Sequence, residues 1–270
     1  MVPETMMLDA LLALKFVLTV AVVLGVSWIA ERFSPRIAGI ITGLPTGTPI
    51  ILFFYGLEHG AQFAADTTVY NQVGFIAGLT QFFAYYKVSA RFKRHGLLLS
   101  LLASLATYFL VAFGLRQIAF TPLTASVALG LAIVFFLYLY KDIPNVEIRE
   151  RVKLTKRVLA FRAVMAAGMV IAVTSVAQLV GTTWAGLLSA LSVTTVPLIL
   201  ILHYTYGARP VHTIIKNFPV GLPAILAYNL TAYYAFPVYG VYWGTLMGYA
   251  TTGVYLVAYT LTKRKWGWLP

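Results

Sequence analysis

The chain alternates long apolar stretches with short polar connections, and nine of the stretches are long enough to cross a membrane. A helix needs about 20 apolar residues to span a bilayer core of roughly 30 Å. The predicted spans lie at residues 8–30, 37–57, 68–88, 97–115, 122–140, 158–180, 183–205, 214–235 and 239–262. Thr121 followed by Pro122 predicts the N-cap and first helical position of the fifth span. The pattern predicts an all-α, polytopic integral membrane protein with about nine transmembrane helices.

Composition excludes a soluble globular domain, because 60% of the residues are hydrophobic and only 10% are charged. The formal net charge is +12, yet the basic residues form short clusters between apolar stretches. Lysine and arginine in such loops mark the cytoplasmic side of a membrane protein. The charge therefore predicts membrane lipids as partners and no nucleic acid. The sequence contains no cysteine, which excludes disulfides and thiolate metal sites.

The basic residues also predict the orientation of the chain. With the N-terminus outside, 17 of the 20 lysines and arginines fall in inner loops. Only Arg116 lies outside, and Lys15 and Arg162 lie within spans. Glu4 and Asp9 precede the first apolar stretch, which argues against a cleaved signal peptide. We expect a multi-pass cell-membrane protein with its N-terminus outside and its C-terminus in the cytoplasm.

One segment of the chain occurs twice, 147 residues apart. Residues 36–61 align with residues 183–208 without a gap and share six identical positions. The same offset places Lys15 on Arg162, each a single cation in an apolar stretch. This repetition predicts a four-helix repeat at 1–118, a linker helix and cytoplasmic loop at 119–157, and a second four-helix repeat at 158–270. Because the second copy enters from the opposite side, the repeats are expected to be inverted, as in many secondary transporters.

The repeated segment contains the candidate binding site. Prolines and glycines in the middle of the second span predict a kink or an unwound stretch, tolerated at that depth only against protein or a water-filled cavity. The candidate substrate-binding residues here are Thr42, Pro45, Thr46, Gly47, Thr48 and Pro49. Those of the seventh span are Ser189, Ser192, Thr194, Thr195 and Pro197. The second copy has fewer helix breakers and is expected to bend less. The alternative interpretation is that the glycines only allow close helix packing.

Charged and amide residues within the spans extend this site. Lys15 and Arg162 either line opposite mouths of one pathway, where they attract an anion or pair with a carboxylate, or snorkel to the headgroups. Gln81 and Asn229 are expected to join helices or to face the cavity. Glu58, His59 and Asp66 are expected at the end of the second span and in a solvated outer loop that follows it, rather than at a site for a cation or proton. His203 and His212 are expected to be satisfied polar residues rather than ligands.

The stretch at 185–228 resembles the small four-helix membrane proteins of the GlpM type. The resemblance is carried by an Ala-Gly-Leu entry, a proline within the helix, the pair His203 and Tyr204, a glycine and a threonine-containing helix that follows. It implies a fused pair of four-helix units with an additional linker helix, and it transfers no binding residue.

The leading functional hypothesis is a secondary transporter or facilitator that moves a small anionic solute by alternating access. The alternative is a lipid or lipid-phosphate flippase or scramblase, in which Lys15 and Arg162 guide a phosphate headgroup. A passive channel is a further alternative. No Walker motif, metal-ligand spacing or Ser-His-Asp arrangement occurs in a convincing context, so no enzyme activity, catalytic residue, metal or cofactor is predicted. The sequence leaves a homodimer open and identifies neither the substrate nor a coupling ion.

Overall fold

The computed structural model describes residues 12–22, 24–25, 40, 44–92, 96–146, 155–191 and 195–266, and within these residues it is helical without any strand. An N-terminal helix covers Leu12–Val22. The labelled helices are α3 (Thr48–His59), α4 (Ala61–Arg91), α5 (Gly96–Arg116), α6 (Pro122–Leu139), α7 (Lys156–Ser189), α8 (Thr195–Tyr206) and α9 (Ala208–Trp266). The prediction of an all-α protein is confirmed.

Three helices are long and apolar enough to cross a membrane, by length and composition. They are α5, α6 and the part of α7 at Leu159–Ser189. Their outer faces carry large apolar side chains, and Leu179 on α7 is 86% exposed. Leu110 on α5 and Leu131 on α6 are exposed in the same way. Such apolar outer faces are rare on soluble monomers and are compatible with a membrane protein.

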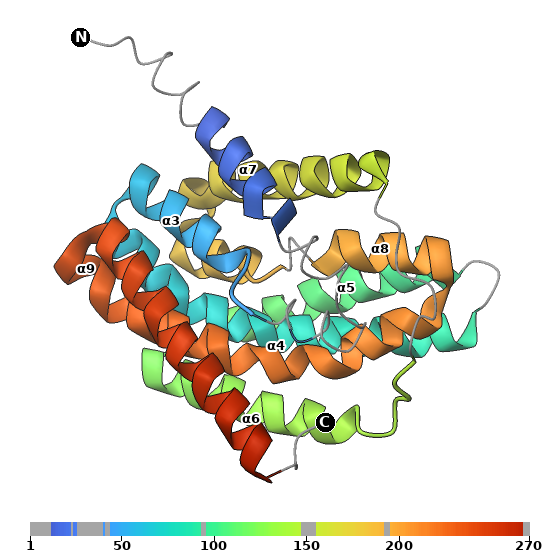
Figure 1. Ribbon diagram of the computed structural model, residues 1–270. Helices are drawn as coiled ribbons and strands as arrows, with labels where there is room; N and C mark the ends of the chain where they lie inside the picture. The colour runs from blue at the N-terminus through green and yellow to red at the C-terminus, as the bar shows by residue number, and fades with distance from the viewer. Residues whose placement is uncertain are drawn as a thin grey trace.

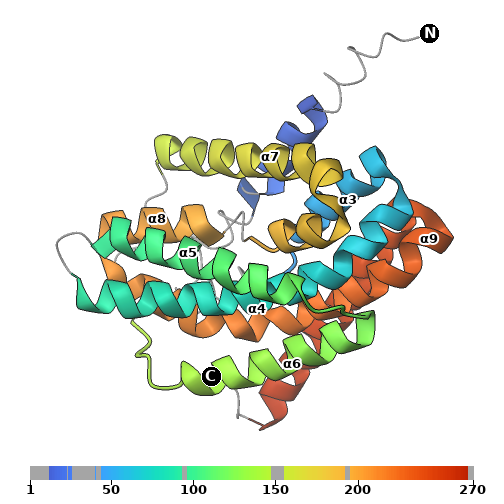
Figure 2. The ribbon, with the colours of Figure 1, turned by 180° about the vertical axis from the view of Figure 1, so that it is seen from behind.

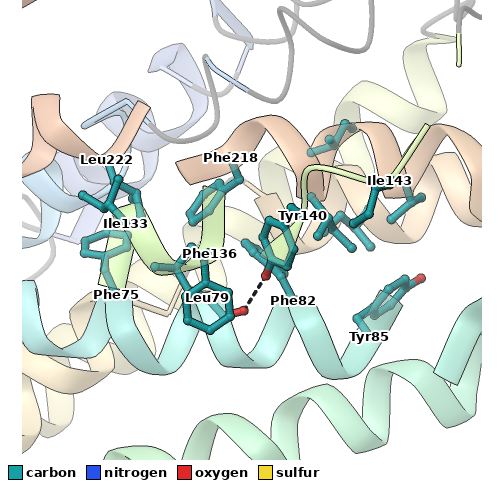
Figure 3. Close-up of a cluster of buried hydrophobic side chains, with 14 of the residues drawn as sticks. Phe75, Leu79, Phe82, Tyr85, Ile133, Phe136, Tyr140, Ile143, Phe218 and Leu222 are labelled. Atoms are coloured by element: carbon teal, nitrogen blue, oxygen red, sulfur yellow. Dashed lines mark hydrogen bonds between the residues drawn. The ribbon is translucent and has the colours of Figure 1, made fainter. Parts of the chain in front are cut away.

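Helix α4 is the central element of the fold. It packs against α3, α5, α6, α7 and α9 (Figure 1). Seen from behind, α8 and α5 lie side by side above α4 (Figure 2). One face of α4 contributes aromatic and aliphatic side chains to a buried cluster with α6, the residues that follow α6, and α9 (Figure 3). In this cluster the Tyr140 hydroxyl donates to the Leu79 carbonyl at 2.7 Å.

Several predicted helix boundaries are confirmed. The predicted spans at 97–115 and 122–140 correspond to α5 and α6. The Thr121 hydroxyl accepts a hydrogen bond from the Thr124 backbone amide, and the two threonines form a reciprocal capping box. Helices α7 and α9 each continue through a glycine with positive φ, Gly181 at +73° and Gly240 at +77°. Gly181 lies between the predicted spans at 158–180 and 183–205, and Gly240 is the second residue of the predicted span at 239–262.

The sequence repeat is also a repeat of local structure. Helices α3 and α8 both have 12 residues and begin at Thr48 and Thr195, which are 147 positions apart. Gly60 and Gly207 follow them at the same offset, with φ of +92° and +80°. Twelve helical residues rise about 18 Å, which is short of a bilayer core. Each copy therefore contains a half-length helix that turns through one glycine into a long helix.

The expected outer loop after the second span is absent from the described structure. Glu58 and His59 form the last turn of α3, and Asp66 lies in the second turn of α4. A single residue, Gly60, connects the two helices, because its positive φ changes the chain direction at one position. The prediction of a solvated loop at these residues is wrong.

Candidate functional site

The first helix break is present where the sequence predicts it. Residues 44–47 are non-helical and lead into α3 at Thr48. Pro49 occupies the first turn of α3, where its missing amide proton costs no helical hydrogen bond. Pro45, Thr48 and Pro49 are buried, whereas Thr46 and Gly47 are half-buried. Thr42 lies outside the described residues.

The second helix break is also present in the structure. Helix α7 ends at Ser189, and α8 begins at Thr195. The smaller bend expected of this copy stays a prediction, because residues 41–43 and 192–194 lie outside the described residues. Ser189, Thr195 and Pro197 are buried, and Ser192 and Thr194 lie outside the described residues.

Side chains from other helices satisfy the carbonyl groups at the end of α7. The Tyr55 hydroxyl of α3 donates to the Ala185 carbonyl at 3.0 Å, and the Tyr108 hydroxyl of α5 donates to the Leu187 carbonyl. The Ser189 hydroxyl donates to the Gly186 carbonyl at 2.7 Å. The last carbonyls of a helix lack intrahelical partners, and burial makes such partners obligatory. These contacts give buried carbonyl groups in the last two turns of α7 a partner, and the Tyr55 hydrogen bond joins α3 to α7.

A chain of amides and hydroxyls joins three helices at the second break. The Asn229 amide of α9 donates to the Asn71 side-chain oxygen of α4 at 2.7 Å. The Asn71 amide donates to the Ser189 hydroxyl at 2.7 Å. All three side chains are buried. Within the described part of the chain, the Asn229 side-chain oxygen and the Thr195 hydroxyl, both buried, have no hydrogen-bond partner. A buried polar atom without a partner costs about 1–3 kcal/mol, which makes both atoms candidates for ligand contact.

Sequence reasoning identified Asn229 and missed Asn71. The signal was two successive amides, Asn71 and Gln72, inside an apolar predicted span. Gln72 accepts a hydrogen bond from Ser126 of α6 at 2.8 Å, so the neighbouring amide points to a different helix. Gln81 is buried on α4, ten residues or about 15 Å beyond Asn71. The structure therefore does not bring Gln81 to the amide chain.

The contact between Asn71 and Asn229 has a counterpart at the repeat offset. Asn71 corresponds to Phe218, and Asn229 corresponds to Phe82. The rings of Phe82 and Phe218 meet edge to face, with centroids 4.7 Å apart (Figure 3). Exchange of partners between equivalent positions is what a twofold relation produces, as in a symmetric dimer interface. Helices α4 and α9 thus meet at two equivalent places, one lined by amides and one by aromatic rings.

Lys15 is buried inside the protein in an ion pair. Its side chain is 1% exposed, and its Nζ atom lies 2.6 Å from Glu58 Oε1 and donates to the Thr174 hydroxyl at 2.7 Å. The ammonium group also lies 5.7 Å from the centre of the Phe54 ring. The Lys15 side chain is thus enclosed by the protein and paired with a carboxylate, which agrees with the pairing alternative rather than with snorkelling. The side chain of Arg162 lies outside the described residues.

The two histidines that follow the second break are satisfied polar residues, as expected. The Tyr85 hydroxyl and His203 Nδ1 share a hydrogen bond, and Ser89 and His212 share another at 2.8 Å. Among the residues that the structure describes, no three His, Cys, Asp or Glu side chains are grouped so that they could hold a metal ion.

Comparison with family models, with curated proteins and with solved structures returned no match. The function must therefore be argued from the geometry alone. That geometry combines two half-length helices, a buried amide chain and a buried ion pair inside a helical protein with apolar outer faces.

Proposed function

We propose that this protein is a secondary transporter or facilitator that moves a small anionic solute across the cell membrane by alternating access. The proposal includes nine spans, two inverted four-helix repeats at 1–118 and 158–270, an outer N-terminus and a cytoplasmic C-terminus. The single observation that carries it is the matched pair of half-length helices, α3 and α8, each preceded by a break at the same repeat position. Transporters with internal repeats bind substrates at such discontinuous helices, and exchange of the two conformations moves the site between the two sides.

The chemistry of the breaks favours an anion. The N-terminal ends of α3 and α8 carry partial positive charge, and the Thr48 and Thr195 hydroxyls lie at those ends. The carbonyl groups of Ala185, Gly186 and Leu187, which would attract a cation, already accept hydrogen bonds from hydroxyl groups. These three carbonyl groups are therefore not free to bind a cation. The proposed solute contacts are the Thr195 hydroxyl, which donates to the anion, and the Asn229 side-chain oxygen, which accepts from a hydroxyl or acid proton of the solute.

The burial of Lys15 favours a solute over a lipid headgroup. A flippase pathway needs cations that a headgroup can reach from the lipid, whereas Lys15 is enclosed and paired with Glu58. The flippase alternative remains an outcome of the transport test.

Replacement of Thr195 by valine is expected to reduce transport at least about tenfold, because valine keeps the shape and removes the hydroxyl. The measurement is uptake of radiolabelled inorganic phosphate, acetate or succinate by liposomes that contain the purified protein. Thr107→Val is the matched control, since the Thr107 hydroxyl on α5 bonds only to its own helix at the Ala103 carbonyl, 2.8 Å away.

Normal uptake by the Thr195 variant would remove this residue from the site. Uptake of none of the three anions above that of empty liposomes would contradict the proposed function. Translocation of a fluorescent phospholipid by the same liposomes would replace it with the flippase alternative.

A further inference from the structure

In the ion pair between Lys15 and Glu58, the lysine is held by more contacts than the glutamate. Lys15 is 1% exposed and directs its Nζ atom to both Glu58 and Thr174, so helix α7 holds it in place. The Glu58 side chain is 16% exposed and contacts Lys15 through Oε1 alone. Its second oxygen, Oε2, is buried without a hydrogen-bond partner in the described part of the chain. A carboxylate accepts about four hydrogen bonds when fully satisfied, so Glu58 is held by few of the contacts that it can make.

A second buried group lies on the same helix face as Lys15. Thr19 follows Lys15 by four residues, which places the two side chains one above the other on the N-terminal helix. Thr19 is 1% exposed, and its hydroxyl has no partner among the described residues. An unpaired buried hydroxyl is unfavourable unless a ligand or water binds it. A cation and an unpartnered hydroxyl donor therefore lie together at a place that the helix breaks do not include.

We propose that Lys15 and Thr19 form a binding site for a small anion with carboxylate or phosphate oxygens, and that Glu58 is an internal competitor for it. This inference rests on the proposed function, in which the solute is an anion, and it adds a second binding site for that solute. An incoming anion displaces the Glu58 carboxylate from Lys15 and accepts a hydrogen bond from Thr19. The exchange of one anion for another keeps the buried ammonium group neutralised throughout, which avoids the large cost of an unpaired buried charge.

The test is the anion dependence of thermal unfolding in the Glu58→Gln variant. Glutamine removes the negative charge that competes for Lys15 but keeps the volume of the side chain. The substitution therefore opens no new cavity, and an anion that binds the variant occupies space already present beside Lys15. The purified full-length protein in detergent is heated in potassium acetate or potassium phosphate, with the bulky HEPES anion as replacement at constant ionic strength. A ligand that binds only the folded state raises the melting temperature. We expect the half-maximal anion concentration of E58Q to be at least about tenfold lower than that of the wild type.

Three further variants separate anion binding from a structural role. K15Q/E58Q removes both charges and is expected to lose the response to acetate and phosphate. E58Q with Thr19→Val is expected to need about tenfold more anion than E58Q, although Thr19→Val alone leaves the unliganded protein equally stable or more stable. Asp66→Asn is the control for a carboxylate elsewhere in the same region, since Asp66 accepts from Gln62 at 2.9 Å and is expected to respond like the wild type.

Each outcome decides the inference. The Lys15–Glu58 pair would be a structural contact only if neither anion raised the melting temperature of E58Q. The same would follow if the anions raised the melting temperature of K15Q/E58Q as much as that of E58Q. If E58Q does not fold, Glu58→Asp provides the same test, because it keeps the charge and shortens its reach. An E58D response equal to the wild type would then overturn the inference. If the wild type transports an anion but the Glu58 variants do not respond to anions, the proposed function stands and this inference fails. If the variants respond but no transport is measured, the inference stands and the proposed function fails.

Discussion

Replacement of Gly186 by valine is expected to prevent stable folding. A Cβ atom at this position would lie 2.4 Å from the Thr67 carbonyl oxygen, 2.8 Å from Tyr70 Cβ and 2.9 Å from the Asn71 amide nitrogen. Two of these atoms belong to the backbone of α4 and cannot rotate away. Overpacking of a core costs about 1–3 kcal/mol and occasionally more, and valine adds two methyl groups to a contact that excludes even the first carbon. The measurement is the yield of monodisperse protein after size-exclusion chromatography, followed by thermal unfolding.

Gly168→Ala is the matched control on the same helix. A Cβ atom at Gly168 has no neighbouring atom within 4 Å, and alanine favours the helical state over glycine. This variant is expected to be as stable as the wild type or more stable. A monodisperse Gly186→Val protein that melts with the wild type would show that α4 and α7 do not need this close contact.

Gly186 and Ser189 lie on one face of α7 and both meet Asn71 of α4, one through close packing and the other through a hydrogen bond. The glycine ladder predicted close packing, and Gly186 does meet the backbone of α4. Ser189, one turn further on, accepts a hydrogen bond from Asn71 instead. Packing and polar contact therefore use neighbouring turns of one helix rather than competing for the same surface.

The sequence predicted helices where composition or a single residue sets the boundary. The apolar stretches at 97–115 and 122–140 are helices α5 and α6, and Gly181, with its positive φ, lies between two predicted spans. The solvated role expected for Glu58 is wrong, although a charged residue two positions before a glycine is typical of a helix end that leads into a loop. Its partner Lys15 lies 43 positions earlier, and no local pattern indicates that folding brings the two together.

The candidate site was predicted in part for a similar reason. Hydroxyl groups beside helix breakers identified Thr48, Ser189 and Thr195 from local sequence alone. Tyr55 and Tyr108 were missed, because an aromatic residue in an apolar span is usually a lipid-facing or core residue. Their hydroxyls cap α7 only through the tertiary arrangement of α3 and α5. Groups that act across helices need the packed structure before they can be assigned.

The amide pair formed by Asn71 and Asn229 is expected to be essential for transport and dispensable for folding. The equivalent meeting of α4 and α9 is made by Phe82 and Phe218, so the repeat accommodates apolar side chains at these positions. Asn71→Leu alone is expected to cost about 1–3 kcal/mol, because it leaves the buried Asn229 amide unpaired. The double variant N71L/N229L removes both partners and is expected to melt within a few degrees of the wild type. Its uptake of the transported anion is expected to fall at least about tenfold.

The control for this pair is provided by the repeat itself. Phe82→Leu with Phe218→Leu changes the equivalent contact without removing a polar group, and it is expected to retain uptake after correction for the amount of folded protein. Thermal unfolding and liposome uptake of the four single and two double variants separate the two roles, since the double-variant cycle isolates the coupling between partners. Wild-type uptake by N71L/N229L would mean that the amides only join α4 to α9. Loss of uptake in a protein that folds as well as the wild type would mean that the amides serve the solute, because the equivalent contact between α4 and α9 is built from Phe82 and Phe218 without them.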